Sequence, residues 1–218
     1  MDENLKKIWQ KRIERTMENL KKNNIDAYYA EKASDVVPIV ESLVAEGSIV
    51  ASGGSVSLEQ SGVAALLRSG RYEYLDRSAP GADSDKVYRQ SFFADAYFCS
   101  SNAVTEKGEL YNVDGRSNRI AAIAFGPKSV IMVVGYNKIV KNIDEAIERV
   151  KKFAAPANTV RLSCNTYCHE KGECLGNGGE ICSGCGSDER ICCNYLISAK
   201  QREKGRIKVI LVGEELGF

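Results

Sequence analysis

Apolar and polar positions along this chain repeat with two different periods. Near the start, apolar side chains recur every three or four residues among charged ones, which predicts an amphipathic helix over residues 4–22 within an N-terminal segment of 1–23. Strands are expected at 25–30, 48–51, 72–75, 96–100, 192–198 and 207–212, helices at 34–46, 57–68, 83–93 and 142–154, and further apolar runs at 121–125 and 129–134. This alternation predicts one α/β domain over residues 1–218, with helices on both faces of a parallel or mixed sheet.

Charge and composition exclude several classes of protein. The 218 residues carry 30 Lys and Arg against 29 Asp and Glu, a formal net charge of +1, which lacks the basic excess of nucleic-acid-binding proteins. No apolar run reaches the roughly 18 residues of a membrane helix. The start of the chain also lacks the basic-then-apolar pattern of a signal peptide. We therefore expect a cytoplasmic protein with no nucleic-acid or membrane partner, and a homo-oligomer is left open.

Cysteine use is the exception to this ordinary composition. Seven of the eight cysteines lie between Cys164 and Cys193, in a glycine-rich stretch with little apolar content to order it. In a reducing compartment such clusters are typical of metal ligands or redox groups, so 164–193 is predicted to be a metal-binding loop. Zinc and an iron–sulfur cluster both stay open, because only Cys182 and Cys185 have a common pair spacing. The alternative is a flexible loop with free thiols.

A glycine-containing turn follows the strand expected at 48–51. Gly53 and Gly54 would let backbone N–H groups approach a ligand, and Ser55 stands at the start of the next helix, where a phosphate or carboxylate is favoured. The alternative is a tight turn in which Ser55 is only the helix cap. The spacing matches neither a dinucleotide fingerprint nor a P-loop, and no nicotinamide or flavin motif is present.

A second polar stretch, residues 100–110, follows the buried run at 96–100. Ser101 and Asn102 could position a ligand there, and Glu106 could act as base or nucleophile. The alternative is a solvated hairpin turn at Lys107-Gly108. Downstream, Asn118 and Arg119 add an amide and a guanidinium suited to a carboxylate or phosphate.

Several of these stretches together resemble the lactate-utilisation (LUD) domain family. The resemblance is carried by SSNAVTEKG at 100–108, NVDG at 112–115, NRIA at 118–121, FGPK at 125–128, VVGYNKIV at 133–140 and LVGEELGF at 211–218. It is strongest to a branch with a four-cysteine tail that ends in a stretch like ERIC at 189–192. The resemblance implies a three-layer Rossmann-like open sheet of the kind shared by glucosamine-phosphate deaminase, ribose-phosphate isomerase and CoA transferases.

The resemblance also implies candidate roles for individual residues. Matched onto the branch, the metal ligands are Cys168, Cys174, Cys185 and Cys192. Extra glycine-rich residues, with Cys182 among them, lie between Cys174 and Cys185, so Cys182 could take the third position. Glu106 resembles the nucleophilic Glu of CoA transferases. Family members are associated with oxidation of lactate to pyruvate alongside separate iron–sulfur proteins.

Three hypotheses follow. The first is a LUD-domain protein that contributes to oxidation of lactate or a related hydroxy acid, with a cysteine-bound metal or iron–sulfur site. A pocket near Gly53, Gly54 and Glu106 would hold its small anionic substrate. The second is a stand-alone enzyme, CoA-transferase-like or sugar-phosphate-isomerase-like, that uses Glu106. The third is a non-catalytic subunit with a structural zinc site. The candidate ligand contacts are Gly53, Gly54, Ser55, Ser101, Asn102, Asn118 and Arg119.

Overall fold

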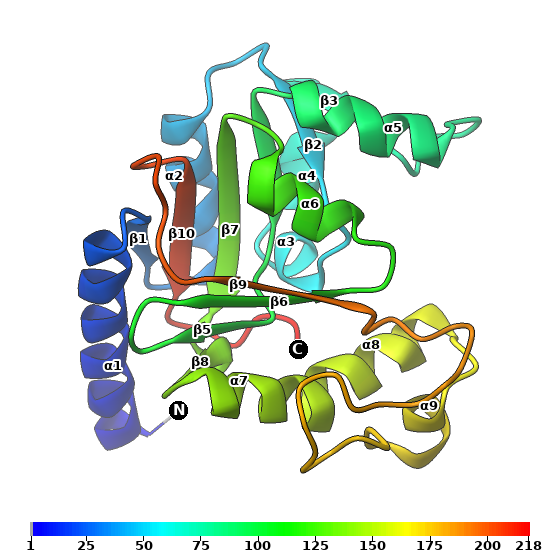
Figure 1. Cartoon of the computed structure of the whole chain (residues 1–218). Helices are drawn as coiled ribbons and strands as arrows, with labels where there is room; N and C mark the ends of the chain where they lie inside the picture. The colour runs from blue at the N-terminus through cyan, green and yellow to red at the C-terminus, as the bar shows by residue number, and fades with distance from the viewer. Residues whose placement is uncertain (1) are drawn as a thin grey trace.

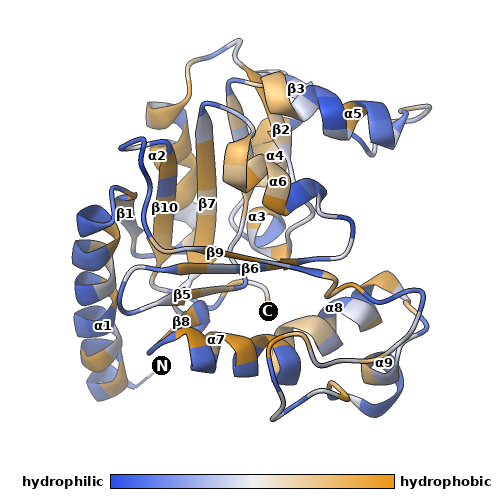
Figure 2. Ribbon diagram, viewed as in Figure 1, coloured by the Kyte–Doolittle hydropathy of each residue, from blue (hydrophilic) through white to orange (hydrophobic). Residues whose placement is uncertain are grey.

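A computed structural model describes residues 2–218 and contains a six-stranded sheet in the order β1-β10-β7-β4-β2-β3 (Figure 1). Every neighbouring pair in this sheet is parallel. The strands are β1 (Asp26–Ala30), β2 (Ile49–Ser52), β3 (Glu73–Leu75), β4 (Ala96–Cys99), β7 (Ser129–Gly135) and β10 (Ile207–Val212). The central strands β7 and β10 are almost continuously apolar, which is typical of strands covered on both faces (Figure 2).

Helices cover both faces of this sheet, so the predicted three-layer fold is confirmed. One face is covered by α1 (Glu3–Lys22) and α6 (Asn118–Phe125), whose apolar side chains join one core cluster. The other face is covered by α2 (Val36–Leu43), α3 (Val56–Gln60) and α4 (Val63–Leu67), which form a second cluster. Helix α5 (Ser84–Gln90) follows β3. No helix within residues 2–218 is long and apolar enough to cross a membrane.

A smaller sheet lies across the lower part of the molecule in the view of Figure 1. Its order is β8-β5-β6-β9, and its strands are β5 (Ala103–Thr105), β6 (Leu110–Asp114), β8 (Ile139–Val140) and β9 (Asn194–Ser198). Helix α7 (Ile143–Arg149) packs against this sheet and continues through a π-helical segment, Val150–Ala154, into α8 (Ala155–Leu162). The short helix α9 (Tyr167–Lys171) opens the cysteine region.

Several segments differ from the sequence prediction, which does not contain strands β5, β6 and β8. The helix expected at 57–68 is divided in two, because Gly62 has a φ of +77°. The apolar run at 121–125 belongs to helix α6. The helix expected to end at 154 continues to Leu162, since Pro156 stands in the first turn of α8, where a missing N–H costs little.

Candidate functional site

A cleft of about 320 Å³ lies at the carboxyl edge of the parallel sheet. Its lining comes from the segments that directly follow four strands: Gly54 and Ser55 after β2, Ser100–Asn102 after β4, Lys138 after β7, and Gly217–Phe218 after β10. The remaining walls come from the loop between β6 and α6, from helix α8, and from Arg77, Tyr88 and Ile191. Ligands of open α/β sheets bind at this edge, so the fold itself marks the cleft as the candidate site.

Positive side chains dominate the cleft. Five basic residues line it: Arg77, Arg116, Arg119, Lys138 and Arg161. Among its lining residues the one acidic side chain is Asp114, whose carboxylate accepts backbone N–H groups of Arg116, Arg119 and Ile120 at 3.1, 2.9 and 3.3 Å. The negative charge of Asp114 is therefore compensated by backbone N–H groups at the start of α6. The balance of charge suits an anionic ligand.

Arg119 is placed at the cleft as predicted, but its donors are already occupied. Its Nη1 donates to the Ser100 carbonyl at 3.1 Å and to Asn112 Oδ1 at 2.6 Å. Its Nη2 donates to Asn102 Oδ1 at 2.8 Å and to the Val113 carbonyl at 2.7 Å. No pair of N–H groups is left to hold a ligand's carboxylate. Arg119 instead ties the ends of β4 and β6 together.

The predicted polar contacts after β4 also have internal partners. Ser101 Oγ lies 2.7 Å from the Ala103 carbonyl and 3.2 Å from that of Tyr111, within donating distance of both. Asn102 Oδ1 accepts the Val113 N–H at 2.9 Å as well as the Arg119 donor. Both residues line the cleft, and their bonded atoms shape its wall. Asn118 lines the cleft at the start of α6.

The glycine turn after β2 combines both expected roles. Ser55 is the cap of α3, because its Oγ accepts the Leu58 N–H at 3.3 Å, and it also lines the cleft. An added Cβ at Gly54 would stand 2.8 Å from Arg77 Nη2, so glycine lets this guanidinium approach the turn. Gly53 lines a neighbouring cavity of about 220 Å³, which shares Gly54, Ser55, Arg77 and Arg161 with the cleft.

Lys138 is a buried basic residue that the sequence analysis does not identify. Its Nζ donates to Ser57 Oγ at 3.0 Å and to Ser100 Oγ at 3.2 Å, and the residue is 4% exposed. Burial, together with the positive charges of Arg149 and Arg119, lowers the pKa of Lys138 to about 7. Burial likewise lowers the pKa of Arg149, to about 10. Its guanidinium donates to the carbonyls of Asn137 at 3.1 Å and Asn102 at 2.8 Å.

Glu106 lies outside the cleft, contrary to the expectation that it shares a pocket with Gly54. It stands in the turn between β5 and β6, so the hairpin considered for residues 100–110 is the arrangement found. Its carboxylate pairs with Arg15 and with Arg12, the latter at 2.6 Å, both on α1. Asn19 donates to its carbonyl at 2.8 Å. Glu106 thus holds α1 against the hairpin, and the geometry gives its predicted catalytic role no support.

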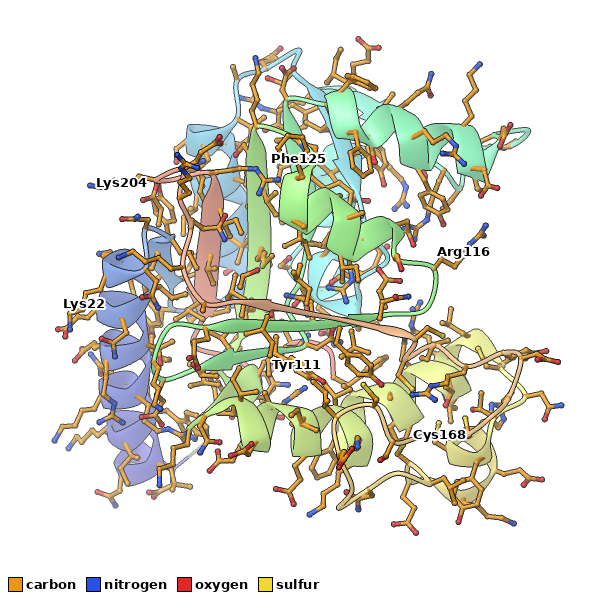
Figure 3. All side chains as sticks on the ribbon, viewed as in Figure 1. Lys22, Tyr111, Arg116, Phe125, Cys168 and Lys204 are labelled. Atoms are coloured by element: carbon orange, nitrogen blue, oxygen red, sulfur yellow. The ribbon has the colours of Figure 1, made fainter. Side chains whose placement is uncertain are left out.

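The four cysteines singled out by the resemblance line one small cavity. Cys168 and Cys174 are buried and Cys185 and Cys192 are half-buried around it, whereas Cys182 is exposed and does not line it. The lobe that contains Cys168, α8 and α9 is seen at the lower right of Figure 3. All eight cysteines of the chain are free thiols.

Arg190 organises this cysteine region. Its guanidinium donates to the carbonyls of Cys182, Cys185 and Cys192 at 3.0, 3.1 and 2.9 Å. Burial raises the pKa of Cys192, which favours the protonated thiol. Four thiols on one cavity have the donor chemistry of a zinc or iron–sulfur site. Within residues 2–218 no three His, Cys, Asp or Glu side chains stand in a metal-binding arrangement, so the thiols would have to move closer together to hold an ion.

Comparison with known proteins identifies the family. The sequence matches the LUD domain over residues 13–212, nearly the whole chain. The chain belongs to the LUD-domain family. The fold is similar to that of a DUF162 family protein from Deinococcus radiodurans, with a TM-score of 0.50, 17% sequence identity, and coverage of 95% of this chain and 98% of that chain. No curated protein matches the sequence.

The LUD family is associated with lactate utilization. In this LUD domain, the cleft side chains that have free hydrogen-bond donors differ from those that the sequence analysis predicts. The sequence analysis predicts Arg119 as the anion-binding residue and does not identify Arg77, Lys138 or Arg161. A signal existed for Lys138, which is the only charged residue in the apolar stretch 129–140. No such signal marked Arg77 or Arg161, since both stand in segments of ordinary surface composition.

Proposed function

We propose that this LUD domain binds the carboxylate of a small hydroxy acid or oxo acid in the cleft, and that it contributes in the cytoplasm to the oxidation of lactate or a related hydroxy acid to pyruvate. The observation that carries the proposal is the excess of cationic side chains at the carboxyl edge of the sheet. The cleft volume of about 320 Å³ is at the lower end of the range for small-molecule sites. The family association with lactate utilization supports the choice of acid.

Three arginines of the cleft have donors to spare, but Arg116 is already paired with Asp85 at 2.9 Å, which leaves two that have no acidic partner among residues 2–218. Arg77 makes one long hydrogen bond, from Nη1 to the Ser52 carbonyl at 3.4 Å. Arg161 directs Nε and Nη2 to Asn158 Oδ1 at 2.9 and 2.8 Å, within its own helix, and its Nη1 is left over. Both residues line the cleft and the neighbouring cavity. Planar guanidiniums with free N–H pairs are suited to a carboxylate, so these two side chains are the proposed anchors.

The cysteine cavity is the proposed cofactor site. Cys168, Cys174, Cys185 and Cys192 would hold the group, and their shared cavity supports this set over one that includes Cys182. An iron–sulfur cluster would supply electron transfer, and zinc would supply structural order. Because the sequence has no nicotinamide or flavin motif, a cluster here or in separate iron–sulfur partner proteins would have to accept the electrons of the oxidation.

The ligand proposal is tested by isothermal titration calorimetry with L-lactate and with pyruvate. Arg77→Met and Arg161→Met remove one charge-assisted contact each, which is worth about 1.5–3 kcal/mol, so each is expected to weaken binding at least tenfold. Arg202→Met removes an exposed cation from the loop between β9 and β10 and should bind like the parent protein. Equal affinities for all four proteins would refute the proposal.

The cofactor proposal is tested on protein purified without oxygen. Its visible spectrum and its content of iron, sulfide and zinc are measured for the parent and for Cys192→Ser, with Cys193→Ser as the neighbouring control. Iron with sulfide supports an electron-transfer role, and zinc alone supports a structural role. Absence of metal from the parent protein, or equal metal in Cys192→Ser, would refute the assigned ligand set.

A further inference from the structure

The two most buried lysines of the described chain are accommodated in different ways. Lys138 and Lys151 are 4% and 6% exposed. Lys151 donates to three backbone carbonyls, those of Gly176 at 2.9 Å, Gly179 at 3.3 Å and Glu180. Three carbonyl acceptors match the three N–H groups of an ammonium, so every donor of the Lys151 side chain has a partner.

Lys138 has no comparable arrangement. Its two acceptors are the hydroxyls of Ser57 and Ser100, which a neutral amine satisfies as well as an ammonium does. No carboxylate within residues 2–218 pairs with it, and Arg119 and Arg149 act on it as like charges. The thiol of Cys99, the other titratable group near it, is buried with a raised pKa of about 12 and is therefore neutral. These surroundings favour the uncharged amine, which is the nucleophilic form of lysine.

We propose that Lys138 is a nucleophile that forms an imine with the carbonyl carbon of a 2-oxo acid bound in the cleft. A 2-oxo acid is the class that joins a carboxylate, suited to Arg77 and Arg161, to an adjacent ketone that a neutral amine attacks. Lys138 lines the same cleft as both arginines. The inference rests on the proposed function for binding of the carboxylate and adds the covalent step.

The step is balanced without a redox partner. Lys138 Nζ adds to the ketone carbon to give a carbinolamine, with a proton passing from nitrogen to the former ketone oxygen. That oxygen then leaves as water, the second amine proton goes with it, and a C=N bond replaces the C=O bond. The hydroxyls of Ser57 and Ser100, at hydrogen-bond distance from Nζ, are placed to relay these protons.

The experiment uses pyruvate as probe and sodium borohydride, which reduces an imine to a stable secondary amine. Intact mass and peptide mapping are measured for the parent protein, Lys138→Arg, which cannot form the imine, and the exposed control Lys200→Met. The expected result is one adduct on Lys138 in the parent and in Lys200→Met and none in Lys138→Arg, with the Lys151 peptide unmodified in all three. An unmodified Lys138, or equal modification of exposed lysines, overturns the inference.

Calorimetry on the same samples separates the two ideas. If pyruvate binds and Lys138 is not modified, the covalent step fails and the proposed function stands. If pyruvate does not bind, both fail together. Circular dichroism of Lys138→Arg confirms that a missing adduct does not come from a missing fold.

Discussion

Replacing Lys138 by methionine should change how the stability of the protein depends on pH. The pKa of Lys138 falls from 10.5 to about 7 on folding because the amine is buried. Between these two values the unfolded chain holds a proton that the folded chain has released, so the free energy of unfolding rises with pH. The slope is about 1.4 kcal/mol per pH unit. Methionine removes this slope, while the other titrating groups are present in both proteins.

The magnitude follows from those two pKa values. From pH 7.5 to pH 9.5, the parent protein should gain about 2 to 3 kcal/mol of stability relative to Lys138→Met. Well below pH 7 the folded and the unfolded parent protein both hold the proton on Lys138, so the difference in free energy of unfolding between the two proteins becomes constant. The assay is urea unfolding of both proteins at the two pH values under reducing conditions, with Lys200→Met as control. A difference that is the same at both pH values would show that Lys138 titrates like an exposed lysine and would refute the reasoning.

Three further substitutions test the site's supports. Gly108→Ala places a Cβ 2.5 Å from the backbone of Asn19 in α1, so it should cost about 2 kcal/mol more in urea unfolding than Gly47→Ala, where φ is also positive and the space is open; equal costs would contradict this. Arg119→Lys should lower stability by at least about 3 kcal/mol in thermal unfolding, since buried acceptors lose their donors, and a loss below 1 kcal/mol would contradict its bracing role. Glu106→Gln should lower stability by about 1–3 kcal/mol and leave pyruvate affinity unchanged, whereas tenfold weaker binding would return Glu106 to the candidate site.

The periodicity of the sequence predicts most of the main sheet because its strands are buried on both faces. Hydrophobic periodicity does not predict the smaller sheet. Strands β5 and β6 contain Thr105 and Asn112, polar residues that are fully buried, so their pattern is that of a polar loop. Arg119 donates to the Oδ1 of Asn112, and the buried Nδ2 of the same side chain has no hydrogen-bond partner among the described residues. Pairing of this kind is a property of the folded chain, and the spacing of residues does not report it.

The sequence predicts the location of the candidate site better than it predicts which side chains can bind a ligand there. The turn at Gly54 and the stretch from Ser100 do meet at one cleft, since both follow parallel strands. Sequence reasoning could not tell which arginines keep free donors. Arg119 has its Nη1 and Nη2 donors bound internally, whereas Arg161 has a spare one, and this difference depends on which carbonyls lie nearby in three dimensions.

Ile191 belongs to two chambers at once, because it lines both the cleft and the cysteine cavity. An added Cβ at Gly115, on the loop after β6, would stand 3.1 Å from Ile191 Cα. Ile191 therefore packs directly against a loop that lines the cleft. Because Ile191 contacts both cavities, ligand binding in one can be coupled to ligand binding in the other. An occupant of the cysteine cavity that shifts Ile191 changes the affinity of the cleft by some factor, and a ligand in the cleft changes the affinity of the cavity by the same factor.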